Sequence, residues 1–202
     1  MTMSFNNQDF SKIYDEYYPK IVRYLSRLIG ELEAEDAAQE IFVKISRSLD
    51  KFRGESSLST WVYRIATNAA MDHLRKPSLK RSLQSTEEKD VPSDEDAGPI
   101  DDAPLLDTLL MRKDMNDCIR GIVESLPADY RTVLVLSEFE GLTNSEIAEI
   151  VGSISLDTAK IRLHRARTKL RKALEAKCIF YRDERNELSC DRKTTPLKFL
   201  KK

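Results

Sequence analysis

Apolar residues in the first third of the chain recur at steps of three and four, the period of an amphipathic helix. One such stripe runs over residues 8–29 and ends at Gly30, and a second runs over residues 33–51. In the second stripe Ala38, Ile41, Phe42, Ile45 and Leu49 point inward. The pattern predicts two core-facing helices joined at a glycine, which is a common helix stop.

A third helix is predicted over residues 58–76, because Pro77 cannot continue it. Trp61 is assigned to its core face, and its outer face combines aromatic, amide and cationic side chains. That outer face consists of Thr60, Tyr63, Arg64, Thr67, Asn68, Met71 and Arg75. These residue types can stack on and hydrogen-bond unpaired bases. The alternative is a half-buried Tyr63 at the rim of the core and a solvated Asn68.

Helical periodicity is absent from residues 78–107, which are rich in Asp, Glu, Ser and Pro. Such a segment buries little apolar surface, so we expect a flexible, self-repelling linker. Helical spacing returns near residue 105, and Pro127 fits the first position of a further helix. The fold predicted is therefore all-α, with two helical domains joined by an acidic linker.

The segment over residues 141–177 is predicted to be a helix-turn-helix. Gly141 suits the end of one helix, and Thr143 with Glu146 forms a capping box that starts a short one. After Gly152 and Ser153, Ser155 can cap a long second helix. This pattern is typical of proteins that insert the second helix into the DNA major groove.

The long second helix has one apolar and one basic side. Its apolar stripe is Leu156, Ala159, Leu163, Ala166, Leu170 and Leu174. The cations on the other side are Lys160, Arg162, Arg165, Arg167, Lys169, Arg171 and Lys172. Like charges at this density repel one another, and DNA phosphates would relieve the repulsion. A solvated basic helix in an ordinary bundle is the other interpretation.

Charged residues make up 33% of the 202 residues, and the net charge of −1 hides an acidic linker and a basic helix. No apolar run approaches the roughly 20 residues of a membrane span, so no membrane insertion is expected. The first residues lack the features of a signal peptide, which favours the cytoplasm. We find neither a Gly-rich phosphate loop nor a nucleophile–base signature, so we expect no enzyme and no cofactor.

The tail, residues 178–202, does not continue the apolar stripe. Its Cys178 and Cys190 lack the short spacing of a zinc site, and the only histidines are His73 and His164. We therefore assign no metal site. Two interpretations of this tail remain open. It binds a metal or senses redox state, or it is a small docked or disordered extension.

Four motifs occur in a defined order along the chain: AEDAAQEIFVKI at 34–45, FRGESSLSTWVYRIATNAAMDHLR at 52–75, LPADYRTVLVLSEFEGLTNSEIAEI at 126–150 and DTAKIRLHRARTKLR at 157–171. With these motifs the chain resembles a bacterial extracytoplasmic-function (ECF) sigma factor of the sigma-70 family, over about residues 8–177. The type is the minimal one, with only the region-two and region-four domains. The resemblance implies a region-two domain at 1–77, a linker at 78–106, a region-four domain at 107–177 and an extension at 178–202.

The resemblance also implies residue roles. Asp36, Gln39 and Glu40 would bind the clamp helices of core RNA polymerase. Asn68 would lie beside a flipped-out base of the melted minus-ten promoter element, with Tyr63, Arg64 and Arg75 nearby on the same helix. The duplex minus-thirty-five element would be read by Thr158, Lys160, Arg162, His164 and Arg165. Such proteins are commonly held inactive by an anti-sigma factor, which is an implied partner.

Two departures from the family pattern lie in the helix-turn-helix. Ser153 resembles a one-residue insertion in the turn, and Ile161 replaces a small polar residue. The base preference at this element is therefore expected to differ. Two other functions remain open: a stand-alone DNA-binding regulator, and an adaptor that occupies polymerase without directing it.

Overall fold

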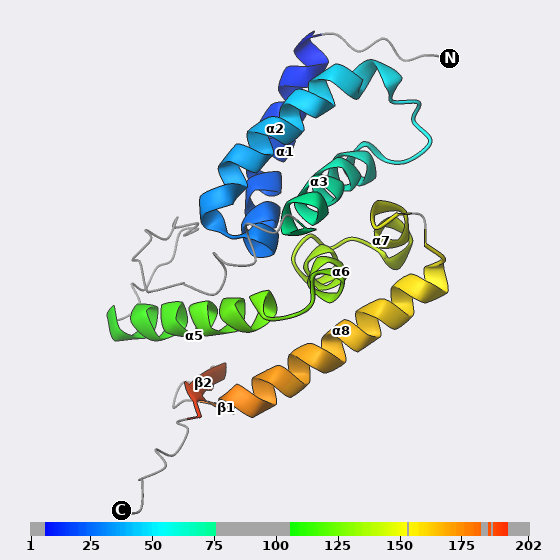
Figure 1. The fold of residues 1–202 in the computed structure, drawn as a ribbon. Coiled ribbons are helices and arrows are strands. Elements are labelled where there is room, and N and C mark those ends of the chain that lie inside the picture. The colour runs from blue at the N-terminus through cyan, green and yellow to red at the C-terminus, as the bar shows by residue number, and fades with distance from the viewer. Residues whose placement is uncertain (1–6, 76–105, 153, 183–185, 187, 194–202) are drawn as a thin grey trace, which may run out of the picture. The chain divides into compact units, whose positions relative to one another are not determined.

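The computed structural model describes residues 7–75, 106–152, 154–182, 186 and 188–193. Within these ranges the elements are α1 (Asn7–Ile29), α2 (Glu31–Ser48), the 3-10 turn η1 (Leu49–Lys51), α3 (Leu58–Arg75), α5 (Leu106–Glu124), α6 (Ala128–Glu138), α7 (Asn144–Ile150), α8 (Leu156–Lys177), β1 (Cys178–Arg182) and β2 (Leu188–Arg192). Figure 1 shows the predominance of helices. The predicted all-α class is confirmed, with one two-stranded sheet added.

The chain divides into two compact units. The first comprises Met1–Lys89 and Leu126–Arg167, and the second comprises Asp90–Ser125 and Thr168–Lys202. Helix α8 therefore begins in the first unit and ends in the second. The predicted acidic linker at 78–106 lies almost wholly outside the described residues. Each unit is described below by itself.

Helices α1 and α2 build the core of the first unit, side by side in Figure 1. Along α1 the buried side chains are Ile13, Tyr17, Ile21, Tyr24, Leu25, Leu28 and Ile29. Along α2 they are Ala34, Ala38, Ile41, Phe42 and Ile45, with Leu49 in η1. The sequence prediction for the inward face of α2 is confirmed, because one apolar stripe faces one neighbouring core.

The predicted faces of α3 need correction. Trp61 is only partly buried and packs on Phe52, with ring centroids 5.2 Å apart. Tyr63, assigned to the outer face, is only 4% exposed, and Thr60 and Thr67 beside it are also buried. The reason is that α3 contacts α1 and α2 on one side and α6 and α7 on the other. A helix packed on two sides buries more than one stripe.

The predicted helix-turn-helix is present, with its caps. Gly141 has φ of +67°, in the left-handed region of backbone conformation that glycine adopts without steric cost. Thr143 and Glu146 form the predicted capping box: the Thr143 N–H donates to Glu146 Oε2 at 2.9 Å, and the Glu146 N–H donates to Thr143 Oγ1 at 3.3 Å. The Thr158 N–H donates to Ser155 Oγ at 3.2 Å at the start of α8. Ser153 lies outside the described residues.

One position in the predicted stripe of α8 is wrong. Ala159, Leu163 and Ala166 are buried, but Leu156 is 44% exposed. Leu156 is the first residue of the helix, so the packed part of the stripe begins one turn later, at Ala159.

A buried arginine links α6 to α1. Arg131 is 7% exposed, and its guanidinium donates through Nη1 to the Leu28 carbonyl at 2.6 Å and through Nη2 to the Leu126 carbonyl at 3.2 Å. Leu28 lies in the last turn of α1, where carbonyls lack helical partners and the helix dipole favours a cation. The contact therefore satisfies the end of α1 with a charge from α6.

The second unit contains α5, the end of α8 and a β-hairpin. Strands β1 and β2 pair antiparallel, with Cys178 opposite Arg192 and Phe180 opposite Cys190. The Lys193 N–H donates to the Lys177 carbonyl at 2.8 Å, which joins the hairpin to the end of α8. Among the described helices, none is long and apolar enough to cross a membrane.

Replacing Arg131 tests whether this buried charge holds the first unit together. Arg131→Met keeps the aliphatic volume but leaves two buried carbonyls without their donor, so we expect the free energy of unfolding to fall by about 1–3 kcal/mol. The control is Arg167→Met, because Arg167 makes an exposed pair with Glu138 at 2.6 Å, of a kind worth about 0–1 kcal/mol. Urea denaturation would measure both variants. Equal losses of unfolding free energy in the two variants would show that the buried contacts of Arg131 stabilise the protein no more than an exposed ion pair does.

Candidate functional site

The outer face of α2 carries three of the predicted site residues. Asp36, Gln39 and Glu40 are all exposed, on the side opposite the buried stripe. Gln39 hydrogen-bonds the hydroxyl of Tyr18, whose pKa is raised by partial burial. The carboxylates of Asp36 and Glu40 are thus accessible on a rigid helix.

A shallow apolar groove of about 360 Å³ lies beside these side chains. It is lined by Phe10, Tyr14, Gln39, Phe42, Val43, Ser46 and Arg47. Tyr14 stacks on Tyr18 with ring centroids 4.7 Å apart and meets the edge of Phe42 at 5.1 Å. Exposed apolar side chains rimmed by polar ones are typical of protein interfaces. The structure thus brings Gln39 to the edge of a surface suited to a protein partner.

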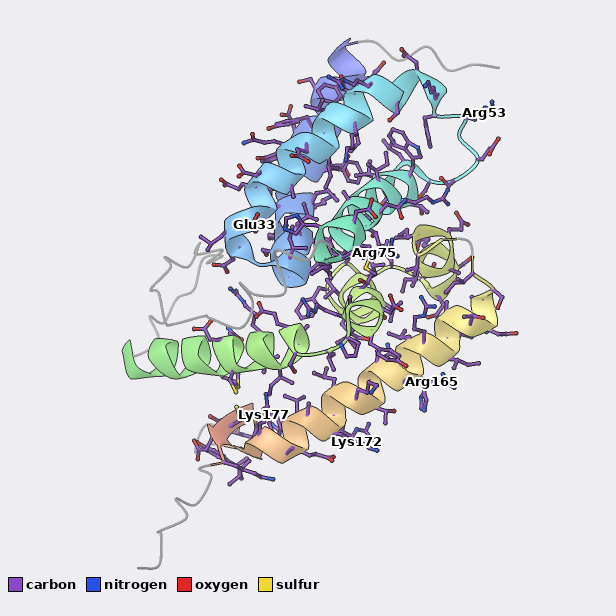
Figure 2. All side chains as sticks on the ribbon, viewed as in Figure 1. Glu33, Arg53, Arg75, Arg165, Lys172 and Lys177 are labelled. Atoms are coloured by element: carbon purple, nitrogen blue, oxygen red, sulfur yellow. The ribbon has the colours of Figure 1, made fainter. Side chains whose placement is uncertain are left out.

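The predicted site residues on α3 differ in accessibility. Asn68 and Arg75 are exposed, and Arg75 pairs with Asp72 at 3.4 Å; Figure 2 labels Arg75 at the end of α3. Arg64 is partly buried and lies 3.6 Å from Glu149 of α7. Asn68 therefore has an open pairing edge, whereas Arg64 already contacts a carboxylate.

Tyr63 lies in a buried polar cluster rather than on an open face. Its hydroxyl donates to Glu140 Oε2 at 2.6 Å, and its ring meets the edge of Tyr24 at 5.3 Å. Glu140 also lies 3.6 Å from Arg27 of α1. Burial, followed by the hydrogen bond to Glu140, raises the pKa of Tyr63 far above its ordinary value, so the phenol stays protonated and donates.

A cavity of about 470 Å³ opens between α3 and the segments α6 to α8 of the same unit. Its lining is Thr67, Asn68, Met71, Asp72, Arg75, Asp129, Thr132, Val151 and Arg162. Asn68 and Arg75 were predicted for one site and Arg162 for another, so the structure brings parts of the two sites to one cavity. Neither hydrophobic periodicity nor the motifs indicated this meeting.

The predicted residues on α8 lie along the beginning and middle of the helix. Thr158, Lys160, His164 and Arg165 are exposed, and Arg162 is partly buried against the cavity. Lys160 lies 3.9 Å from Asp157. Figure 2 labels Arg165 on α8, with Lys172 and Lys177 farther along the same helix. Ile161 is 52% exposed between these cations.

Sequence reasoning missed three charged residues that hold this arrangement: Arg27, Arg131 and Glu140. Each finds a partner far away in the sequence, and a charged residue in an amphipathic pattern is normally assigned to solvent. Only the apolar run that follows Arg131 in α6, from Val133 to Leu136, hinted that it lies inside. Among the described residues, no group of three or more His, Cys, Asp or Glu could hold a metal ion.

Comparison with known proteins identifies the family. Residues 13–79 match Sigma-70 region 2, and residues 116–170 match Sigma-70, region 4. The chain is 36% identical over 170 residues to the ECF RNA polymerase sigma factor SigW of Bacillus subtilis. The match covers 82% of this chain and 88% of SigW. It is 33% identical over 167 residues to the RNA polymerase sigma-H factor of Pseudomonas aeruginosa, covering 82% and 86%. The chain belongs to the ECF sigma factors of the sigma-70 family.

A solved structure shares the fold of this ECF sigma factor. The sigma factor RpoE from Bartonella quintana, solved in complex with the anti-sigma factor NepR, matches with a TM-score of 0.61 and 24% identity, over 83% of this chain and 98% of that one. Most of α1 and all of α2 and α3 lie within the region 2 match, and α6, α7 and most of α8 lie within the region 4 match. The cavity at Asn68 is thus lined by residues of both sigma regions.

The contact between the two sigma regions is testable through Tyr63 and Glu140. In a double-mutant cycle of Tyr63→Phe and Glu140→Ala, we expect a coupling free energy of about 1–3 kcal/mol, because the hydrogen bond is charged and largely buried. The exposed pair of Arg167 and Glu138 supplies the control cycle, with about 0.2–1 kcal/mol expected. Chemical denaturation of the four variants in each cycle gives the numbers. Additive losses for Tyr63 and Glu140 would show that the two side chains do not interact in solution.

Proposed function

We propose that this ECF sigma factor binds core RNA polymerase, directs it to a set of promoters and takes part in melting them. The observation that carries the proposal is the occurrence of both sigma-70 regions in one chain, in order. In this role the chain performs no catalysis itself, since the polymerase makes the RNA, and it acts in the cytoplasm beside the polymerase. Region two corresponds to residues 1–77 and region four to 107–177, joined by the linker at 78–106.

The polymerase would bind the outer face of α2. The exposure of Asp36, Gln39 and Glu40 supports this, and so does the apolar groove beside Gln39. Exposed carboxylates set the orientation of a charged partner, whereas buried aromatic area supplies most of the affinity in protein interfaces. Together the two features suit a helical partner with basic side chains.

Promoter melting would involve α3. Extruding a base from the duplex costs a few kcal/mol, which contacts to the extruded base must repay. Asn68 offers both a donor and an acceptor from an exposed position, and Arg75 can contact phosphate. Tyr63 and Arg64 are proposed minus-ten residues that become available only when their contacts with Glu140 and Glu149 open.

The minus-thirty-five element would be read as duplex by α8. Thr158, Lys160, His164 and Arg165 project from its exposed face, and Arg162 would join them once the cavity opens. A helix of this kind contacts bases near its N-terminal part and phosphates along its length. An anti-sigma factor is part of the proposal, since the Bartonella quintana RpoE was solved with one.

The proposal is tested by adding the purified chain to bacterial core RNA polymerase and sequencing the start sites of RNA made from genomic DNA. Core polymerase alone is the control. We expect discrete new start sites that share two spaced sequence motifs upstream. Binding to core without new start sites would instead identify a polymerase-binding adaptor. Tight duplex binding without any affinity for core would identify a stand-alone regulator.

Asn68→Ala tests the minus-ten role. If Asn68 contacts an extruded base, the variant opens promoters about 10- to 100-fold more slowly, equivalent to about 1–3 kcal/mol, while it binds core normally. Permanganate reactivity of unpaired thymines, followed over time, measures opening. Asn116→Ala is the matched control, because Asn116 is an exposed asparagine on α5. Normal opening by the Asn68 variant would remove this residue from the melting site.

Arg165→Ala tests the minus-thirty-five role. If Arg165 reads a base, its loss costs about 1–3 kcal/mol and relaxes specificity at one promoter position; if it contacts only phosphate, all sequences weaken alike. Affinities for a set of single-base promoter variants, measured with polymerase holoenzyme, separate the two cases. Arg167→Ala is the control for the loss of one positive charge on α8, because the Arg167 guanidinium already donates hydrogen bonds to Glu138. An unchanged affinity across the whole set would place Arg165 outside the DNA interface.

A further inference from the structure

The three cysteines of the chain meet in the second unit. Cys118 lies in α5, Cys178 is the first residue of β1, and Cys190 lies in β2. The sulfur atoms of Cys118 and Cys178, 60 positions apart in the sequence, are separated by 3.8 Å, and all three residues are free thiols. No role in binding polymerase or DNA uses this cluster.

The strand register distinguishes the possible disulfide pairs. Cys178 lies opposite Arg192, and Cys190 lies opposite Phe180, so Cys178 and Cys190 are diagonal neighbours on one face of the hairpin. Diagonal positions have Cα atoms about 7–8 Å apart, beyond the roughly 4.4–6.8 Å that a disulfide bridges. Cys118 has no such constraint, because it comes from a helix. Its sulfur lies 3.8 Å from that of Cys178; the Cys190 thiol also hydrogen-bonds Cys178, so it is the strand register that separates the two pairings.

The environment of Cys178 favours an oxidised pair at equilibrium. Burial, followed by the neighbouring thiols Cys118 and Cys190, raises the pKa of Cys178 to about 11. A site that stabilises the thiolate stabilises the reduced form, so its disulfide is easy to reduce. A site that disfavours the thiolate stabilises the disulfide relative to the reduced form. Cys118 and Cys190 are only partly buried, so an oxidant can reach the cluster from their side.

We propose that Cys118 and Cys178 form a reversible disulfide when the protein meets a peroxide. The Cys118 thiol loses its proton to solvent and the thiolate attacks hydrogen peroxide; the O–O bond breaks, a sulfenic acid forms, and the leaving hydroxide takes up that proton as one water. The Cys178 sulfur then attacks the Cys118 sulfur, the S–O bond breaks, and a second water leaves. Two thiols lose two electrons and two hydrogens in total, and one peroxide gains them.

The bond would fasten α5 to the end of α8. Cys178 directly follows Lys177, the last residue of α8, and the hairpin is joined to that last turn by the Lys193 N–H and by the Lys193 ammonium, which donates to the Glu175 carbonyl. A covalent bond at Cys178 therefore restrains the last turn of α8 as well as the hairpin. This inference does not depend on the proposed function.

The test uses the full chain, reduced and then treated with one equivalent of hydrogen peroxide. Remaining thiols are alkylated, and the protein is digested without reductant for mass spectrometry. We expect one peptide pair linked through Cys118 and Cys178, two hydrogens lighter than the separate peptides and released by dithiothreitol. We also expect the melting temperature of the oxidised protein to rise by several degrees, since the bond closes a long loop.

Single-cysteine variants give the matched controls. Cys190→Ser should form the same linked pair, whereas Cys118→Ser should form none, and both should keep the helical circular dichroism of the wild type. Cys178→Ala serves as a second disruptive variant that keeps a small side chain at a buried position. A link between Cys178 and Cys190, or oxidation to sulfinic acid without any link in the wild-type protein, would overturn the proposal.

Discussion

The free-energy cost of burying charged side chains limits how the helices of the first unit can be arranged. A guanidinium or a carboxylate loses several kcal/mol of hydration inside a protein unless hydrogen bonds replace it. Arg131 obtains two carbonyl oxygens, at Leu28 and Leu126, and Glu140 obtains the Tyr63 hydroxyl and the Arg27 guanidinium. In each case a partner lies on α1 or α3, so α6 and the turn after it fit only where those helices supply the partners. Helix α7 contacts both α3 and α6.

Local sequence rules were sufficient wherever a helix packs on one side or ends at a specific cap. The inward face of α2 follows from the spacing of Ala38, Ile41 and Ile45 alone, and the start of α7 follows from Thr143 and Glu146. The exposure of Asp36 and Glu40 follows from the same periodicity, because a residue opposite a buried stripe faces solvent. These features depend on residues within a few turns of one another, which is the range over which sequence pattern is informative.

The same rules failed where a feature depends on a second neighbour. The outer face assigned to α3 is partly buried because Tyr63 and Thr67 contact Tyr24 of α1, and Tyr63 also bonds Glu140 beyond the end of α6. Nothing within the helix records these partners. Trp61 was assigned to the core face of this helix, yet it is only partly buried and packs on Phe52. Likewise, the sequence analysis weighed Cys178 and Cys190 as tail residues only, whereas the sulfur of Cys118 in α5 lies 3.8 Å from that of Cys178. Tertiary partners far apart in sequence decide these cases.

The contacts around the cavity at Asn68 differ greatly in strength, and this difference suits a reversible arrangement. The pair of Arg64 and Glu149 is open to solvent, with 36% and 47% of the side chains accessible, so it contributes about 0–1 kcal/mol and weakens with salt. In the proposed role of Arg64, a DNA phosphate would replace Glu149 as its partner at little cost. The Glu140 carboxylate is only 9% accessible, so separating it from Tyr63 requires that water or another donor reach it at once. In the proposed function, the exposed pair would therefore exchange partners first, and the buried contact between Tyr63 and Glu140 would set most of the free energy needed to open the cavity.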